Sequence, residues 1–132
     1  MSENQKPKFR EFVLESGAKI FLGRDAESND ELMKKYKGKE NTILHTKYPG
    51  SPFGVIEKIN PSSGDIIASG AIVAKYSQCW RDYKKDIDMD IFIGKDISKP
   101  KNAKKGLWSV KKTKTIKIKK KDIIKFENEN TI

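Results

Sequence analysis

A chain of 132 residues and 15.1 kDa is large enough for one hydrophobic core and one domain. No apolar run approaches the roughly 18 residues that a membrane-spanning helix needs, and residues 1–9 lack the apolar stretch of a signal peptide. Cys79 is the only cysteine, which excludes an internal disulfide and a cysteine-cluster zinc site and favours a reducing compartment. We therefore expect a cytoplasmic protein with no membrane segment.

The net charge of +10 comes from one part of the sequence. Residues 95–125 hold 13 Lys and 2 Asp, a net charge of +11, whereas residues 1–94 have a net charge of only +1. A lysine-rich coding bias would scatter the charge, but a surface for a polyanion would concentrate it. The alternatives are a disordered basic tail or a solvated basic face, and apolar residues spread over residues 107–126 argue against disorder.

The first predicted elements are a hairpin and a short helix. Apolar runs at residues 12–14 and 20–22 flank a Ser-Gly turn, which predicts a β-hairpin. Ser28 and Glu31 have the spacing of a capping box, so we expect a short helix that opens at Ser28 and runs to about Tyr36.

The central part of the chain predicts three strands and the longest helix. Residues 42–46 and 53–58 read as strands on either side of a dense Pro-Gly turn. A helix is expected over about residues 65–83, rich in small side chains that would let it lie close against a sheet. Residues 87–93 alternate apolar and polar side chains, the period of a half-buried strand.

The chain looks extended again from residue 107, and a short last strand is expected at residues 123–126.

The fold class predicted is α+β, a single domain with a mixed, mostly antiparallel sheet, a long central helix and one short helix. We expect a polar N-terminal segment at residues 1–11, the domain at residues 12–126 with its basic part at 95–125, and an acidic tail at residues 127–132.

Several short motifs occur in order along most of the chain, namely Gly23–Ala26, Asn29–Leu32, Ile43–His45, Pro49–Phe53, Ala74–Ser77, Trp80 and Lys99–Gly106. In this order and spacing, over about residues 12–120, the sequence resembles the NFACT-R domain. That domain is the RNA-binding module of the NFACT proteins of ribosome-associated quality control, and it also occurs as a stand-alone archaeal protein. The Ser-Pro-Phe sequence after Gly50 is more similar to the archaeal version.

The resemblance implies an RNA-binding domain with tRNA or ribosomal RNA as its ligand. The N-terminal NFACT domain, helix-hairpin-helix elements and coiled coil of the full-length proteins do not fit in 132 residues. Activities that depend on those parts are therefore not carried over.

The chemistry of the basic residues points to phosphate. Lysine is a compact point charge without the planar fork of arginine, so a lysine-rich surface holds a nucleic-acid backbone without reading bases. On an extended strand Lys117, Lys119 and Lys121 would lie about 7 Å apart and could follow successive phosphates. The predicted RNA-binding residues are Arg24, His45, Lys47, Tyr48, Lys99, Lys101, Lys104, Lys105, Trp108, Lys111, Lys112, Lys114, Lys117 and Lys119.

Some of these residues have competing structural interpretations. Trp108 and Tyr48 could stack on bases or pack in the core, and Arg24 could pair with Asp25 or Glu27 instead of RNA. His45, the only histidine, could be a hydrogen-bonded structural residue, an RNA contact or a general base.

Other residues read as structural. We expect Trp80 to pack in the core and Cys79 to be a buried, inert thiol. Asp88 and Asp90 share a strand face, where paired carboxylates are usually solvated and seldom bind metal.

The sequence favours a non-catalytic RNA-binding module that holds tRNA or ribosomal RNA and works with the ribosome. The alternative is an accessory tRNA-binding subunit of an RNA-modification enzyme, with the partner supplying the chemistry. An independent enzyme that uses His45 as its base is a weaker hypothesis, because no nucleophile motif accompanies that residue. No catalytic residue, metal site or cofactor is expected.

Overall fold

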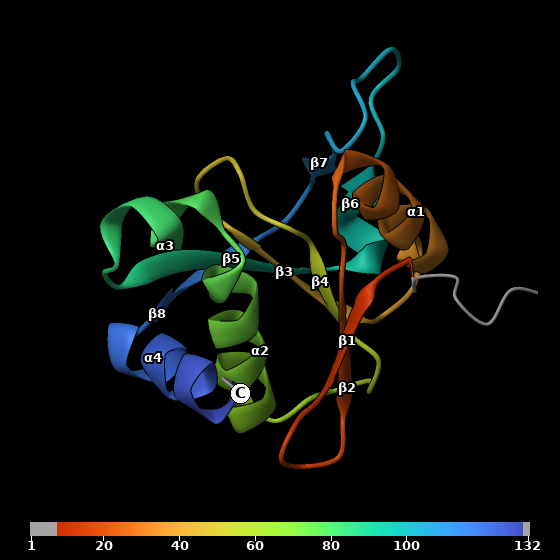
Figure 1. The fold of residues 1–132 in the computed structure, drawn as a ribbon. Helices are drawn as coiled ribbons and strands as arrows, with labels where there is room; N and C mark the ends of the chain where they lie inside the picture. The colour runs from red at the N-terminus through yellow and green to blue at the C-terminus, as the bar shows by residue number, and fades with distance from the viewer. Residues whose placement is uncertain (1–7, 131–132) are drawn as a thin grey trace, which may run out of the picture.

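A six-stranded antiparallel sheet forms the centre of the structure, a computed structural model in which residues 8–130 are described (Figure 1). In chain order its strands are β1 (Arg10–Val13), β2 (Lys19–Leu22), β3 (Thr42–Thr46), β4 (Gly54–Ile56), β5 (Ile87–Ile93) and β8 (Lys114–Ile118). Across the sheet their order is β1-β2-β4-β3-β5-β8, and every pairing is antiparallel.

Helices and a small hairpin cover the two faces of this sheet. The remaining elements are α1 (Ala26–Tyr36), α2 (Ser63–Lys75), α3 (Gln78–Tyr83), the short 3₁₀ helix η1 (Gly94–Asp96), β6 (Ile97–Ser98), β7 (Ser109–Val110) and α4 (Lys120–Glu129). α2 and α4 pack together on one face, and β6 pairs with β7 as a separate two-stranded sheet beside α1 (Figure 1). The predicted α+β single domain is confirmed.

Strand alternation divides the core into two clusters. Successive side chains of a strand point to opposite faces, so the neighbours Ile43 and Leu44 of β3 enter different clusters although both are fully buried. Leu44 joins the cluster under α2 and α4, whereas Ile43 joins Leu32 and Met33 of α1. The sheet is therefore a central layer, and the segment that carries most of the lysines returns to it at β8.

The first helix begins earlier than the sequence predicts. Its N-cap is Asp25, whose carboxylate accepts a hydrogen bond from Ser28 N at 2.8 Å, while Ser28 Oγ accepts one from Asp25 N at 3.0 Å. Ser28 is thus the third residue of α1 rather than its cap. The expected capping box of Ser28 and Glu31 is wrong because Asp25 is an equally good cap three residues upstream.

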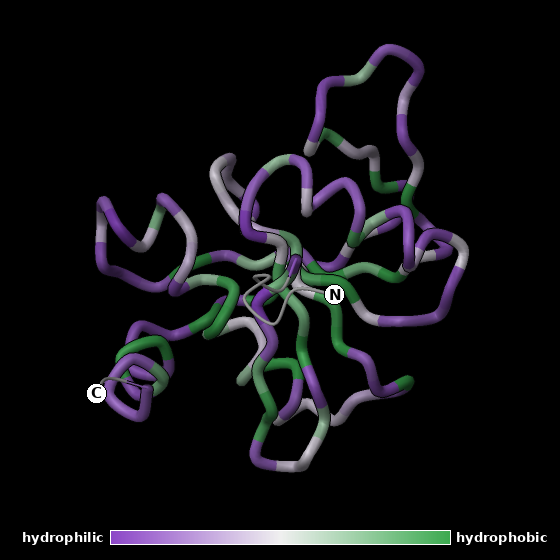
Figure 2. The backbone as a smooth tube through the Cα atoms, turned by 45° about the vertical axis from the view of Figure 1, so that its right-hand side comes forward, coloured by the Kyte–Doolittle hydropathy of each residue, from purple (hydrophilic) through white to green (hydrophobic). Residues whose placement is uncertain are grey.

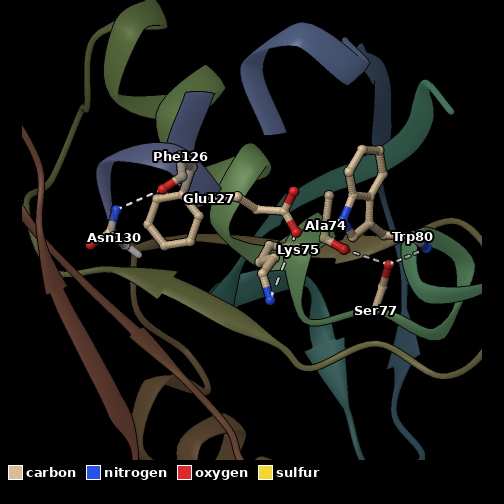
Figure 3. Close-up of polar contacts among 7 residues, drawn as sticks. All are labelled: Ala74, Lys75, Ser77, Trp80, Phe126, Glu127 and Asn130. Atoms are coloured by element: carbon tan, nitrogen blue, oxygen red, sulfur yellow. Dashed lines mark hydrogen bonds and ion pairs between the residues drawn. The ribbon is translucent and has the colours of Figure 1, made fainter. Parts of the chain in front are cut away.

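The predicted single helix over residues 65–83 is also wrong. α2 ends at Lys75, and Ser77 then caps α3 by accepting a hydrogen bond from Trp80 N at 3.2 Å and donating one to Ala74 O at 2.6 Å (Figure 3). A serine hydroxyl that binds nearby backbone groups competes with helix continuation. The chain therefore breaks at Ser77 and starts a second helix.

The small side chains of α2 do allow the close packing expected of them. A Cβ atom on Gly70 would lie 2.4 Å from Cδ1 of Ile118 in β8, so only glycine fits the present approach of α2 to the sheet. Ile118 is fully buried at this contact.

The predicted strand at residues 123–126 is instead part of α4. Ile123 and Phe126 are three residues apart, which places them on one face of a helix, and Ile123 is fully buried against the cluster under α2. Glu127, expected in an acidic tail, lies in α4 and accepts a hydrogen bond from Trp80 Nε1 at 3.1 Å; its carboxylate also lies 4.0 Å from Lys75 Nζ (Figure 3). The end of the expected tail, residues 131–132, and residues 1–7 of the N-terminal segment lie outside the described residues.

None of the helices within residues 8–130 is both long and apolar enough to cross a membrane.

Candidate nucleic-acid interface

The connection between β6 and β7 forms a loop that extends away from the body of the protein. Residues 99–108 make this loop, which is mostly hydrophilic and stands clear of the sheet (Figures 1 and 2). Lys101, Lys104 and Lys105, hereafter the loop lysines, are exposed, and none of them takes part in an ion pair within the described part of the chain. The loop therefore presents three exposed positive charges that have no acidic partner among the described residues.

A buried carboxylate of α1 fixes the base of this loop. Asp30 Oδ1 accepts hydrogen bonds from Gly106 N at 2.7 Å, Trp108 Nε1 at 2.9 Å and Lys99 Nζ at 3.0 Å. Lys99 Nζ also donates to Lys104 O at 2.6 Å, which ties one side of the loop to the other. Asp30 thus holds both ends of the loop against α1.

The surroundings of Asp30 keep it ionised. Burial raises the pKa of this carboxyl, but the hydrogen bonds from Gly106, Trp108 and Lys99, together with the charge of Lys99, outweigh burial and hold the pKa below its usual value. The Lys99 ammonium group forms an ion pair with the Asp30 carboxylate, and the indole N–H of Trp108 donates its hydrogen bond to the same carboxylate. In the structure both residues anchor the loop, while their contact with RNA stays a prediction.

Sequence reasoning missed Asp30 as a functional residue. One feature of the sequence could have pointed to Asp30: it is an acidic residue on the same inward face of α1 as Met33. A buried charge on such a face is stable only when it has hydrogen-bonding or charged partners. Those partners lie about seventy residues away in the chain, so no local pattern names them.

Two lysines at the C-terminal end of β8 and just after it differ from the loop lysines, because they face carboxylates. Lys117 Nζ lies 3.1 Å from Asp88 Oδ1, and Lys119 Nζ lies 4.0 Å from Asp86 Oδ2. The hydrogen bond that Lys117 donates to the Asp88 carboxylate raises the pKa of the lysine. Two of the predicted RNA-binding charges are therefore offset by carboxylates at and just before the start of β5.

The expected ladder of lysines along one strand face is wrong. β8 ends at Ile118, Lys119 is the N-cap of α4, and Lys121 lies inside that helix. The ladder requires extended backbone through residue 121, and the helical period of residues 120–129 replaces it. Lys117 is the only one of the three that lies on β8.

Two further lysines occupy the connection between β7 and β8, and a third is the first residue of β8. Lys111, Lys112 and Lys114, hereafter the connection lysines, are exposed and form no ion pair within residues 8–130. The backbone of Lys111 donates to Asp96 O at 2.7 Å, so this connection is tied to η1 at the end of the hairpin opposite the loop.

Arg24 lies close to the base of the loop. It is exposed between β2 and α1, and its backbone N donates to Ser28 Oγ at 2.7 Å. Gly106 of the loop packs against Ala26, where a Cβ on Gly106 would lie 3.3 Å from Cβ of Ala26. Within residues 8–130 the Arg24 guanidinium makes no ion pair with Asp25 or Glu27, although its charge contributes to lowering the pKa of Asp25.

His45 is half-buried, and its surroundings lower the pKa of its imidazole. Its Nδ1 lies 2.7 Å from Thr46 O, and its ring centroid lies 4.5 Å from that of Phe53. Burial lowers the pKa of the imidazole. The backbone carbonyls of Thr46 and Ser51 and the charge of Asp90 raise that pKa, but burial has the larger effect. This packing supports the structural interpretation, and RNA contact by His45 stays a prediction.

Lys47 and Tyr48 lie away from the hairpin loop. Both are exposed in the turn after β3, and Lys47 N donates to Asp88 O at 3.0 Å, near the start of β5. The hairpin follows the other end of β5, about 17 Å away by the strand rise from Asp88 to Ile93. The fourteen predicted residues therefore form two groups rather than one patch.

The acidic residues of β5 have partners of their own. Asp90 Oδ1 accepts a hydrogen bond from Thr115 Oγ1 at 2.7 Å, and Asp88 faces Lys117. Over residues 8–130 no group of three or more His, Cys, Asp or Glu side chains is arranged to hold a metal ion.

Comparison with known families identifies the domain. The family model described as the NFACT protein RNA binding domain matches residues 8–112. The match covers most of the chain and includes α1, the loop and the hairpin. The chain belongs to this family of RNA-binding domains, as the resemblance of its motifs predicts.

A solved structure shares the fold. The C-terminal part of the fibronectin/fibrinogen-binding protein from Streptococcus suis superposes with a TM-score of 0.80 at 22% sequence identity, over 96% of this chain and 51% of that one. The chain thus spans about half the length of this structural relative. No curated protein matches the sequence significantly.

Proposed function

We propose that this chain is a non-catalytic module that holds structured RNA, a tRNA or a segment of ribosomal RNA, mainly through contacts between lysine side chains and phosphates. The observation that carries the proposal is the anchored loop, which presents three charged lysines that have no acidic partner among the described residues. In this proposal the module acts in the cytoplasm and binds its RNA at the ribosome.

The anchor at Asp30 supports this role. Fixing the loop before RNA arrives reduces the conformational entropy that binding would otherwise cost. Arg24 near the loop base and the connection lysines at the other end of the hairpin extend the positive surface. Because lysine contacts a phosphate as a point charge, the proposed binding has little sequence preference.

A charge-removal experiment tests the proposal. The variant with Lys101→Gln, Lys104→Gln and Lys105→Gln should bind a tRNA transcript about 10- to 100-fold more weakly than wild type at low salt. The slope of log K against log salt should fall by about 2 to 3, because each lost phosphate contact removes roughly 0.7 to 0.9 from it. Fluorescence anisotropy over a salt series measures both quantities.

The matched control removes three positive charges elsewhere. Lys19, Lys58 and Lys125 are exposed and lie outside the hairpin and its loop. Their joint replacement by Gln should lower affinity much less than the loop variant does. Equal losses in the two variants would show a general charge effect rather than a loop site, and an absence of RNA binding by the wild-type protein would refute the proposal.

A further inference from the structure

A cavity lies at the end of β5 that is far from the hairpin loop. The turn after β3, helix α3 and the ends of β5 and β8 enclose a volume of about 860 Å³, which is within the roughly 300–1,000 Å³ of ligand-binding pockets. In Figure 1 the turn after β3 lies beside α3. Tyr48, Pro49 and Tyr83 are among the residues that line the cavity.

Both exposed aromatic side chains of the described residues line this cavity. Tyr48 is 49% exposed and Tyr83 is 66% exposed, whereas every other aromatic side chain within residues 8–130 is buried or half-buried. A solvated aromatic face adds nothing to the core, but it offers a platform on which any base can stack. The two rings therefore mark the cavity as a place for a planar ligand.

The walls of the cavity are held in place without a ligand. Gln78 N at the start of α3 donates to Gly50 O at 2.8 Å, and Lys47 N donates to Asp88 O at 3.0 Å. Gly50 has φ of 85°, and a Cβ there would lie 2.5 Å from the Gln78 side chain. The positive φ is the reason that this turn favours glycine, because the exposed Gln78 side chain could move aside.

The charges around the cavity favour an anion. Its three carboxylates are already engaged: Asp82 with Arg81 at 2.9 Å, Asp88 with Lys117, and Asp86 with Lys119 and the backbone of Lys120. Lys84, Lys85 and Lys120 line the same cavity and form no ion pair within the described chain, and Lys84 Nζ lies 4.9 Å from the centroid of the Trp80 ring. Lys85 Nζ instead lies 5.3 Å from the centroid of the Tyr83 ring. Aromatic rings and unpaired ammonium groups together suit a base joined to a phosphate.

We propose that this cavity accepts one unpaired nucleotide of the bound RNA. Its base stacks on Tyr48 or Tyr83, and its phosphate contacts Lys84, Lys85 or Lys120. The inference rests on the proposed function, since it requires that the chain bind RNA. It adds that the protein distinguishes single-stranded from fully paired RNA at a site separate from the loop lysines.

The test compares two RNA hairpins with the same number of phosphates. One carries a single-stranded adenosine tail and the other carries an abasic tail. The wild-type protein should bind the adenosine-tailed hairpin about 10-fold more tightly than the abasic one, because stacking of one base on a tyrosine contributes an affinity gain of about this size. The double variant Tyr48→Ala, Tyr83→Ala should lose this preference, and the double variant with Phe at both positions should keep it. Ile59→Ala removes an exposed apolar side chain outside the cavity and should leave the preference intact.

The only cysteine supplies a second readout, because Cys79 is half-buried rather than fully buried as the sequence predicts, and it lines the same cavity. The adenosine-tailed hairpin should slow alkylation of Cys79 by a small maleimide, and the abasic hairpin should slow it less. Free adenosine monophosphate that binds as tightly as the tailed hairpin would overturn the assignment to RNA.

The two proposals fail in different ways. If both hairpins bind with equal affinity and the tyrosine variants change nothing, the cavity inference is wrong while the lysine–phosphate proposal stands. If neither hairpin nor tRNA binds the wild-type protein, both proposals are wrong.

Discussion

The hairpin loop at residues 99–108 and the segment from β8 to α4, residues 114–129, are both rich in lysine, yet they use it differently. In the loop, Lys101, Lys104 and Lys105 have no acidic partner among the described residues, and buried apolar side chains are absent. In the second segment Ile118 and Ile123 are fully buried, and Lys117 and Lys119 face carboxylates, whereas Lys114 and Lys120 form no ion pair within the described residues.

The difference teaches that a run of lysines in a sequence has two physical meanings. One is an exposed, unneutralised surface that a polyanion can use. The other is the solvated outer side of an element whose inner side builds the core. Net charge alone does not separate them, because the separation depends on which acidic side chains the fold brings near.

The largest expected effect tests the structural half of this comparison. Ile118→Ala should lower the free energy of unfolding by about 2 to 5 kcal/mol, because it opens a cavity where α2 packs on β8. Leu107→Ala, in the loop and 57% exposed, should change it by less than about 0.5 kcal/mol. Urea denaturation followed by circular dichroism measures both. Similar losses in the two variants would contradict the division into a core segment and a surface loop.

The next effect concerns the loop anchor. Asp30→Asn keeps the size of the side chain but removes the charge that accepts three hydrogen bonds, so the free energy of unfolding should fall by about 1 to 3 kcal/mol. The amide of Gly106 should exchange its hydrogen faster, and affinity for tRNA should fall although no lysine has changed. Unchanged exchange at Gly106 would show that Asp30 does not anchor the loop.

A smaller effect appears in the dependence of stability on pH. The pKa of Asp30 is lower in the folded protein than the roughly 3.9 of an unfolded chain. The stabilisation from its ionised form is therefore fully present above that unfolded value and is lost as the pH falls through the folded pKa. Below about pH 4 the wild-type protein should lose stability more steeply than Asp30→Asn, as thermal melting across a pH series would measure. Parallel curves would exclude this contribution.

The smallest effect is expected at Lys117. Its ion pair with Asp88 is exposed to solvent, and exposed pairs contribute little to stability. Lys117→Gln should leave the melting temperature nearly unchanged and should weaken tRNA binding less than Lys104→Gln does. A larger loss of affinity at Lys117 than at Lys104 would reverse the comparison and assign the RNA surface to β8.

Local sequence patterns were reliable where one neighbourhood decides the structure. The strands at residues 42–46 and 87–93 follow the sequence prediction, because alternation and flanking turns specify them. The motifs in their order predicted the family correctly. The apolar residues 123, 124 and 126 fit a strand as well as a helix, and packing against α2 selected the helix.

The sequence by itself determined the fold class, the family and the concentration of positive charge in residues 95–125. Only the tertiary structure decided which of those charges stay unpaired, because the carboxylates of Asp30, Asp86 and Asp88 reach their lysines from distant parts of the chain. It also brought Tyr48 and Tyr83 to one cavity, since hydrogen bonds between the turn after β3 and α3 join segments that no local pattern connects.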